Sequence, residues 1–131
     1  MNLKVISQTK KVFEGEVNSV SIPGTLGYMG IFPGHTNLIS TLEIGKVKIQ
    51  LPNKKEKILA INGGLVQVYK DQVTILVQEA VLAEKIVKQE IDKALKNAKE
   101  KKSGDLPPSE LIQLEKQIKY AKLKQKVVNR L

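Results

Sequence analysis

The chain has 131 residues and a mass of 14.5 kDa, which fits one domain of ordinary size with a small appendage and excludes two large domains. It contains 22 Lys and Arg against 13 Asp and Glu, and the resulting net charge of +9 favours an anionic partner or surface. With no Cys and a single His, the composition excludes disulfide frameworks, thiol catalysis and Cys-based zinc sites.

Residues 1–83 show the pattern of short β-strands. β-branched runs alternate with turn residues such as Pro33-Gly34, Pro52-Asn53 and Lys70-Asp71, and no helical pattern interrupts them. The expected strands are 3–7, 15–22, 30–32, 46–51, 57–61, 65–69 and 73–78, with further turns at Pro23-Gly24 and Asn62-Gly63-Gly64. Many short strands with hairpin-sized connections predict an antiparallel β sandwich or barrel as the first domain, residues 1–83.

Residues 84–131 change to a helical period and form the second predicted domain. Val87, Ile91, Ala94 and Ala98 predict one helical stripe, on a helix over about 84–102. After Pro107-Pro108, a second helix over about 108–130 carries a heptad-like seam of Leu111, Leu114, Ile118, Ala121, Gln125 and Val128. Together they predict an antiparallel helical hairpin that is stable only when it is docked on the sandwich or on a partner.

The hairpin carries most of the charge. Residues 84–131 hold thirteen Lys and Arg against seven acids, a net +6, whereas residues 1–83 hold nine Lys against six acids, a net +3. A nucleic-acid interface would combine such charge with aromatic or Arg-rich faces, yet this region has one Arg and one Tyr. The charge therefore favours an acidic protein surface, with plain solubility as the simpler interpretation.

Catalytic and metal sites are not expected. His35 lies in a Pro-Gly turn without the Cys, or the Ser and Asp, that would make it catalytic, and the bland interpretation is a ring bonded to nearby backbone. The acids of residues 1–83 are scattered singly, without the pairing that acid–base or metal chemistry needs. The sequence thus predicts a binding protein, not an enzyme.

Three blocks of the sequence resemble the epsilon subunit of F-type ATP synthases. They are the opening residues 3–15, the segment 27–45 with its Pro33-Gly34-His35, and the stretch from Asn62-Gly63-Gly64 to Ala80. The motif residues Pro33, Gly34, His35, Gly63 and Gly64 are interpreted as structural. The resemblance implies a β sandwich followed by a helical hairpin, and a non-catalytic rotor subunit that binds the gamma subunit and the c ring.

The resemblance also assigns candidate contacts. A loop facing the c ring is expected at Gly27, Tyr28, Met29 and Gly30. In many bacterial relatives the hairpin inhibits ATP hydrolysis through basic residues that face the beta subunit of the alpha–beta catalytic head. Combined with the charge pattern, this suggests a beta-subunit contact at Lys116, Lys119, Lys122 and Lys126.

Some relatives bind ATP on the hairpin through an Ile/Leu-Asp-x-x-Arg-Ala motif. The matching residues here begin with Ile91 and Asp92, but Leu95 replaces the Arg and Lys96 the Ala. Without the guanidinium fork the phosphate contact is weakened. No cofactor is therefore expected, and ATP at Ile91, Asp92 and Lys96 stays an open alternative.

The expected location follows from the same resemblance. No apolar run approaches the roughly 20 residues of a membrane span, and residues 1–11 alternate apolar and polar, unlike a signal or transit peptide. We expect a peripheral protein at the cytoplasmic face of a bacterial plasma membrane, in contact with the membrane only through a proton- or sodium-translocating complex; a plastid thylakoid is the second choice. The alternative function is a stand-alone basic module for RNA or an acidic protein.

Overall fold

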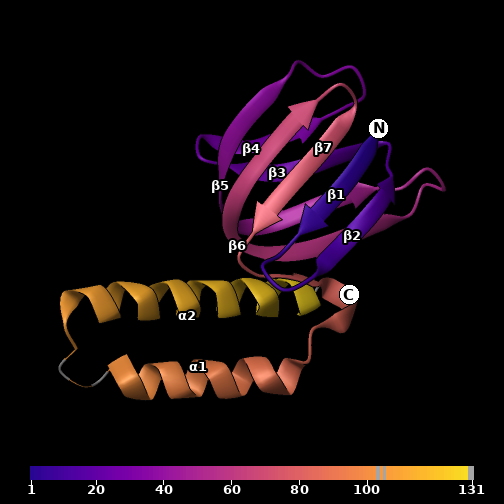
Figure 1. Ribbon diagram of the computed structural model, residues 1–131. Helices are drawn as coiled ribbons and strands as arrows, with labels where there is room; N and C mark the ends of the chain where they lie inside the picture. Colours follow the sequence, from indigo (N-terminus) through magenta and orange to yellow (C-terminus); the bar gives the residue numbers. More distant parts are fainter. Residues whose placement is uncertain (103, 105, 130–131) are drawn as a thin grey trace.

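A β sandwich stands on a pair of antiparallel helices (Figure 1). The structure is a computed structural model that describes residues 1–102, 104 and 106–129. The elements are β1 (Asn2–Ile6), β2 (Lys11–Glu16), β3 (Ser19–Gly24), β4 (Gly27–Ile31), β5 (Leu38–Gln50), β6 (Glu56–Tyr69), β7 (Gln72–Val77), β8 (Ala80–Leu82), the 3-10 turn η1 (Ala83–Lys85), α1 (Lys88–Lys102) and α2 (Pro108–Asn129). The predicted fold class, a sandwich followed by a helical hairpin, is confirmed.

The two long strands β5 and β6 hold the sandwich together. They pair antiparallel along almost their whole length, and the strand order is β2-β1-β7-β6-β5-β3-β4. The first half of β6 also pairs with β8 and its second half with β7, so that β6 belongs to both layers. The pairing of β1 with β7 is parallel and is an exception to the predicted antiparallel pattern.

The core follows from the period of two in the strands. On β5, Val47 and Ile49 are fully buried while their neighbours Lys46 and Lys48 are half-buried, as expected for one wet and one dry face. Aliphatic side chains from both layers meet in a single cluster, and Phe13 packs against it as the one partly buried aromatic of the sandwich. The scarcity of aromatics in the sequence therefore does not prevent a closed core.

The turn predicted at Asn62-Gly63-Gly64 is wrong, because these residues lie inside β6, where the strand leaves β8 and joins β7. A Cβ on Gly64 would lie 2.1 Å from the carbonyl oxygen of Leu76 on the neighbouring strand. The side-chain oxygen of Asn62 accepts a hydrogen bond from the backbone N–H of Glu79 at 3.0 Å. Glycine therefore serves a close approach of two strands and not a reverse turn.

Other strand and turn predictions also need correction. The expected strands 30–32 and 46–51 are only the ends of β4 and β5. The expected strand 15–22 is divided between β2 and β3, with Val17 and Asn18 between them. Pro23 and Gly24, predicted as a turn, are the last residues of β3 and still pair with β4. The hairpin turn is formed by the next two residues, Thr25 and Leu26. The turns at Pro52-Asn53 and Lys70-Asp71 are confirmed, and Lys70 and Asp71 both have positive φ.

The helices differ from the prediction in where they start and in which side chains they bury. Residues Ala83–Lys85 form η1, so α1 begins at Lys88 and not at residue 84. Of the predicted stripe, Ile91 and Ala98 on α1 are buried and Ala94 is exposed, while Val87 lies before the helix and is exposed. The helix α2 is described to Asn129; residue 130 of the predicted range lies outside the described residues.

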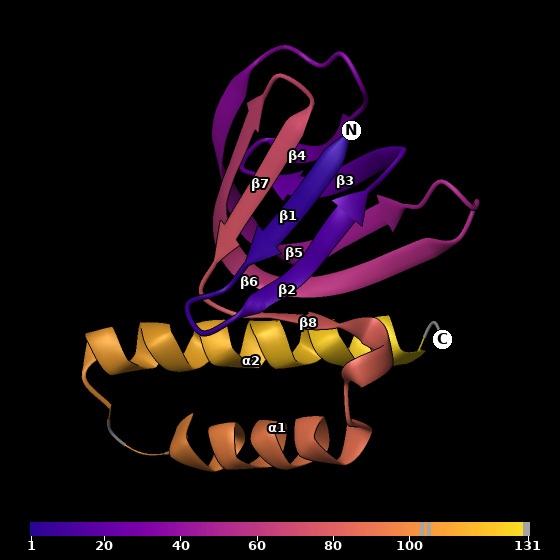
Figure 2. The same cartoon turned by 45° about the vertical axis from the view of Figure 1, so that its right-hand side comes forward.

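The predicted seam of α2 is correct only in part. Leu114 and Ala121 are buried, while Leu111, Ile118, Gln125 and Val128 are half-buried. Tyr120 and Val127, which lie off the predicted seam, are also buried. A second buried side of α2 faces the sandwich: α2 packs on β5 and β6 and carries α1 on its other side (Figure 2).

Candidate interaction surfaces

Large apolar side chains are exposed on the outer face of the layer formed by β5, β6 and β7. Leu65 on β6 and Leu76 on β7 lie directly opposite each other and are 42% and 46% exposed. Ile39 on β5, one diagonal step from Leu65, is 70% exposed. Leu26, at the β3–β4 turn, is completely exposed. We call Leu26, Ile39, Leu65 and Leu76 the apolar face.

The centre of this face carries no charge, although 27% of the residues of the chain are charged. Its outward positions on β5, β6 and β7 include Thr41, Gln67, Tyr69, Gln72 and Thr74, and charged side chains begin at its edges, with Glu43 on β5 and Lys4 on β1. The wet face of an antiparallel sheet is normally polar and charged. A contiguous uncharged face with exposed leucines is typical of a protein-binding surface.

A hollow of about 650 Å³ extends this face toward the β3–β4 hairpin. Leu26 and Met29 line it from the hairpin, and Leu38 and Ile39 from β5. The hydroxyls of Thr25 and Thr41 lie 2.7 Å apart and tie the hairpin to β5. The hairpin tip and the apolar face therefore form one continuous surface.

The segment Gly27, Tyr28, Met29 and Gly30 is not a loop, because it forms β4 and pairs with β3. Tyr28 accepts a hydrogen bond from the backbone N–H of Lys46 at 3.4 Å. Together with Lys46, it lines a hollow of about 200 Å³ whose other wall is Leu123, Lys126 and Val127 of α2. Tyr28 thus lies between the sandwich and α2, and Leu26 is the side chain that projects from the hairpin.

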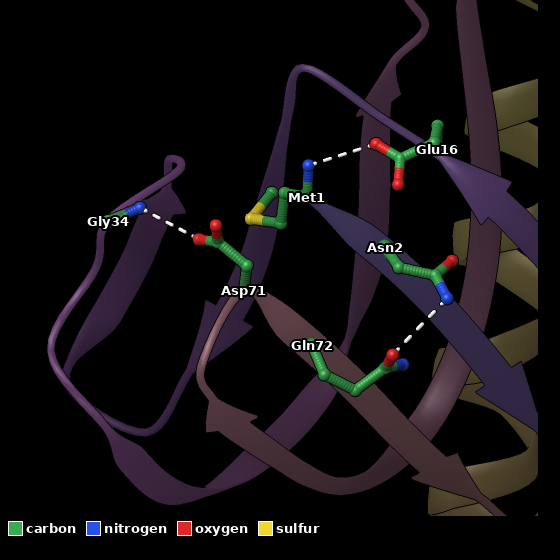
Figure 3. Close-up of polar contacts among 6 residues, drawn as sticks. All are labelled: Met1, Asn2, Glu16, Gly34, Asp71 and Gln72. Atoms are coloured by element: carbon green, nitrogen blue, oxygen red, sulfur yellow. Dashed lines mark hydrogen bonds and ion pairs between the residues drawn. The ribbon is translucent and has the colours of Figure 1, made fainter.

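The predicted motif residues Pro33, Gly34 and His35 lie in the loop between β4 and β5. The N–H of Gly34 donates to the Asp71 side chain at 3.0 Å, which fastens this loop to the β6–β7 turn (Figure 3). Gly34 has a φ of 82°, a conformation that favours glycine. Figure 3 also shows the ion pair between the Met1 amine and Glu16 and the bond from Asn2 to Gln72.

His35 has no catalytic surroundings. Its Nδ1 lies 2.8 Å from the carbonyl oxygen of its neighbour Thr36. This is the local backbone contact that the sequence predicts for it. In the part of the chain that the structure describes, no group of three His, Cys, Asp or Glu residues could hold a metal ion. In the same part, no helix is long and apolar enough to cross a membrane.

The four lysines suggested as a beta-subunit contact are all exposed on α2, but they do not have the same surroundings. Lys119 and Lys122 are exposed to solvent. Lys116 lines a hollow between α2 and β6, and Lys126 lines the one beside Tyr28. With the hairpin docked, half of this basic set therefore borders the sandwich.

The candidate ATP residues are not gathered into a site. Ile91 is buried in the hairpin, whereas Asp92 and Lys96 are exposed on α1. Five hollows of the described residues are lined by other side chains. With the hairpin docked, the buried Ile91 is thus separated from the exposed Asp92 and Lys96.

Sequence reasoning missed the apolar face and Tyr120. The Leu65–Leu76 pair follows from the Lys70-Asp71 turn, which the sequence predicts correctly, whereas the place of Ile39 beside Leu65 depends on the β5–β6 register, which the misplaced turn at residues 62–64 hid. Tyr120 could have been found, because Tyr120 and Val127 are seven residues apart and so share one side of a helix.

Comparison with known proteins gives consistent matches. Residues 1–83 match the family described as ATP synthase, delta/epsilon chain, β-sandwich domain. Over 99 residues the chain is 35% identical to the ATP synthase epsilon chain of Prochlorococcus marinus strain MIT 9301, covering 76% of this chain and 73% of the relative. It is 37% identical over 99 residues to the epsilon chain of a Nitratiruptor species, covering 76% and 77%.

Two solved structures share the fold. A chain of the Euglena gracilis mitochondrial ATP synthase, in an assembly with OSCP, F1 and the c-ring, superimposes with a TM-score of 0.80 at 26% identity, covering 96% of this chain and 79% of the other. A chain of the Tetrahymena thermophila mitochondrial ATP synthase, from the central stalk and c-ring, gives a TM-score of 0.67 at 15% identity, covering 98% and 96%. The second match shows the fold alone.

Proposed function

Because the chain belongs to the epsilon-chain family of F-type ATP synthases, whose members are non-catalytic subunits of the central stalk, we propose that it couples c-ring rotation to the catalytic head and restrains ATP hydrolysis through its hairpin. The proposed partners are the gamma subunit, the c ring, and the beta and alpha subunits. The proposed place is the cytoplasmic face of a bacterial plasma membrane, since the two relatives described above are bacterial. The proposed complex transports protons or sodium ions.

The uncharged apolar face carries this proposal. A stalk subunit has to hold its partner through every turn of the rotor, and burial of exposed leucines stabilises such a contact by about 25 cal/mol per Å². We assign the gamma subunit to Ile39, Leu65 and Leu76 of this face and the c ring to the adjoining β3–β4 hairpin, where Leu26 projects. The four lysines of the basic set on α2 are assigned to the catalytic head, because their charge suits an acidic protein surface.

The test of the stalk role is association with the gamma subunit. The full chain is mixed with purified gamma subunit and, separately, with an ATP synthase preparation from which epsilon has been removed. We expect the chain to elute with both on gel filtration and to sediment with membranes that carry the complex. Chain that stays free, or that sediments with polyribosomes, would contradict the stalk role and favour the stand-alone basic module.

Neutralising the basic set tests the regulatory role. With Lys116, Lys119, Lys122 and Lys126 all changed to Gln, the restraint is expected to weaken about tenfold, because four exposed ion pairs contribute roughly 0.2–1 kcal/mol each. The rate of ATP hydrolysis by the assembled complex would then rise. The matched control changes four exposed sandwich lysines, Lys10, Lys54, Lys55 and Lys70, to Gln. Unchanged hydrolysis in an intact assembly would count against the contact.

A further inference from the structure

The hairpin is joined to the sandwich through α2. This helix packs on β5, β6 and η1 along one side, and α1 lies on the far side of it from the sandwich (Figures 1 and 2). The helix α1 packs against α2. The position of the whole hairpin therefore depends on what holds α2.

The helix α2 has two buried stripes, which contact different neighbours. Leu114 and Ala121 are seven residues apart and so lie on one side, and Tyr120 and Val127 lie on a second side about 100° away. The second stripe faces the sandwich, because Val127 borders the hollow with Tyr28 and the Tyr120 hydroxyl reaches β6. The first stripe is left to meet Ile91 and Ala98, the buried residues of α1. The seam between the helices is thus aliphatic.

Tyr120 is the polar part of the contact with the sandwich. Its side chain is 6% exposed, and its hydroxyl donates to the backbone carbonyl oxygen of Ala60 at 3.3 Å. Ala60 is fully buried on β6, between its partners Lys46 on β5 and Val81 on β8. The Lys124 ammonium lies 4.7 Å from the ring centroid. The hydroxyl therefore binds β6 at a residue where β6 is paired with both β5 and β8.

The surroundings keep this hydroxyl a donor. Burial, and secondarily the carboxylate of Glu79, raises the pKa of Tyr120 above its usual range, so that the phenol stays protonated. Beside it lies a hollow of about 510 Å³ between α2 and the middle of β6. Asn62, Gly63 and Gly64 line it from the strand, and Lys116 and Gln117 from the helix. The Tyr120 hydrogen bond is therefore a localised contact at the edge of a hollow, and not part of a continuously packed interface.

We propose that Tyr120 is a latch that holds the helical hairpin on the sandwich. Release of the latch would move the ring away from β6 and Lys116 away from the sandwich. The latch is a property of the chain itself and goes beyond the proposed function. If that function fails, the latch can still be present, because the tests below need no partner.

Hydrogen exchange on the full chain tests the latch. Tyr120→Phe keeps the ring and removes the hydroxyl, and the exposed Tyr69→Phe on β6 is the matched control. Losing one hydrogen bond to a buried carbonyl is expected to raise the exchange rate of α2 amides about tenfold. The amides of β5 and β7 should be unchanged, and Tyr69→Phe should behave like the unmodified chain.

A distance measurement keeps the proposal falsifiable if exchange is ambiguous. The chain has no cysteine, so spin labels can be placed cleanly at Lys54→Cys in the sandwich and Lys122→Cys on α2. With Tyr120 intact, we expect a narrow distribution of distances between the two labels. Tyr120→Phe should shift part of that distribution to longer distances. Identical α2 exchange and distances in both Tyr variants would overturn the latch. A uniform rise across sandwich and hairpin would also overturn it, by showing global destabilisation.

Discussion

Replacing Gly64 by alanine is expected to destabilise the fold by about 3–5 kcal/mol, because the new methyl clashes with a neighbouring strand and because alanine disfavours the backbone conformation of this glycine. A Cβ at this position would lie 2.1 Å from the Leu76 carbonyl oxygen, which belongs to the backbone of β7 and cannot rotate away. Gly64 also has a φ of 155°. Relief of the clash would require β6 to move off β7 at the point where β6 changes layers. Urea denaturation followed by circular dichroism measures the effect.

Two further glycine variants separate the causes of this loss. Gly27 has a positive φ of 127° but no heavy atom within 4 Å of an added Cβ, so Gly27→Ala reports backbone strain alone. Gly15→Ala has neither, since the atom closest to its Cβ is in the Phe13 ring at 3.8 Å. We expect the order Gly64→Ala, Gly27→Ala, Gly15→Ala, from most to least destabilised. A Gly64→Ala chain as stable as Gly15→Ala would show that β6 and β7 are not closely apposed there.

The same glycines show where sequence reasoning stops. Period-two alternation and turn dipeptides were sufficient to predict a sandwich, because local steric preferences and the inward face agree along β1, β5 and β7. Gly63 and Gly64 look identical to a turn in a sequence, since both a turn and a close strand approach need a residue without Cβ. Only tertiary pairing tells them apart, and here β6 pairs on both sides of the glycines.

The candidate surfaces follow the same division. The resemblance located the β3–β4 segment and the basic helix, which are continuous stretches of sequence. It could not reveal the apolar face, whose members come from four separate elements and meet only through register. On α2, helix period was sufficient in principle to find the Tyr120 and Val127 stripe. A prediction of a single seam omits this stripe, because a helix packed between two neighbours buries two sides.

Charges placed on the apolar face are expected to abolish partner binding while leaving the fold intact. Leu65→Lys with Leu76→Glu puts an opposite-charge pair directly across β6 and β7, an arrangement that sheets tolerate, so stability should change by less than about 1 kcal/mol. Two charges buried against an apolar partner surface should cost about 4 kcal/mol or more, which is about a thousandfold in affinity. Calorimetric titration with the gamma subunit measures the affinity, and circular dichroism checks the fold.

The matched control makes the same kinds of change in the C-terminal part of the chain, at Val87 just before α1 and at Ile112 on α2. Val87 and Ile112 are about as exposed as Leu65 and Leu76 but lie outside the sandwich, so Val87→Lys with Ile112→Glu alters charge and exposed apolar area without touching the face. Only the sandwich variant should lose the gamma subunit, because a charge matters only where binding removes its water. Equal binding by the sandwich variant and the unmodified chain would rule out this face. Equal loss in both variants would mean that the helices also bind the partner.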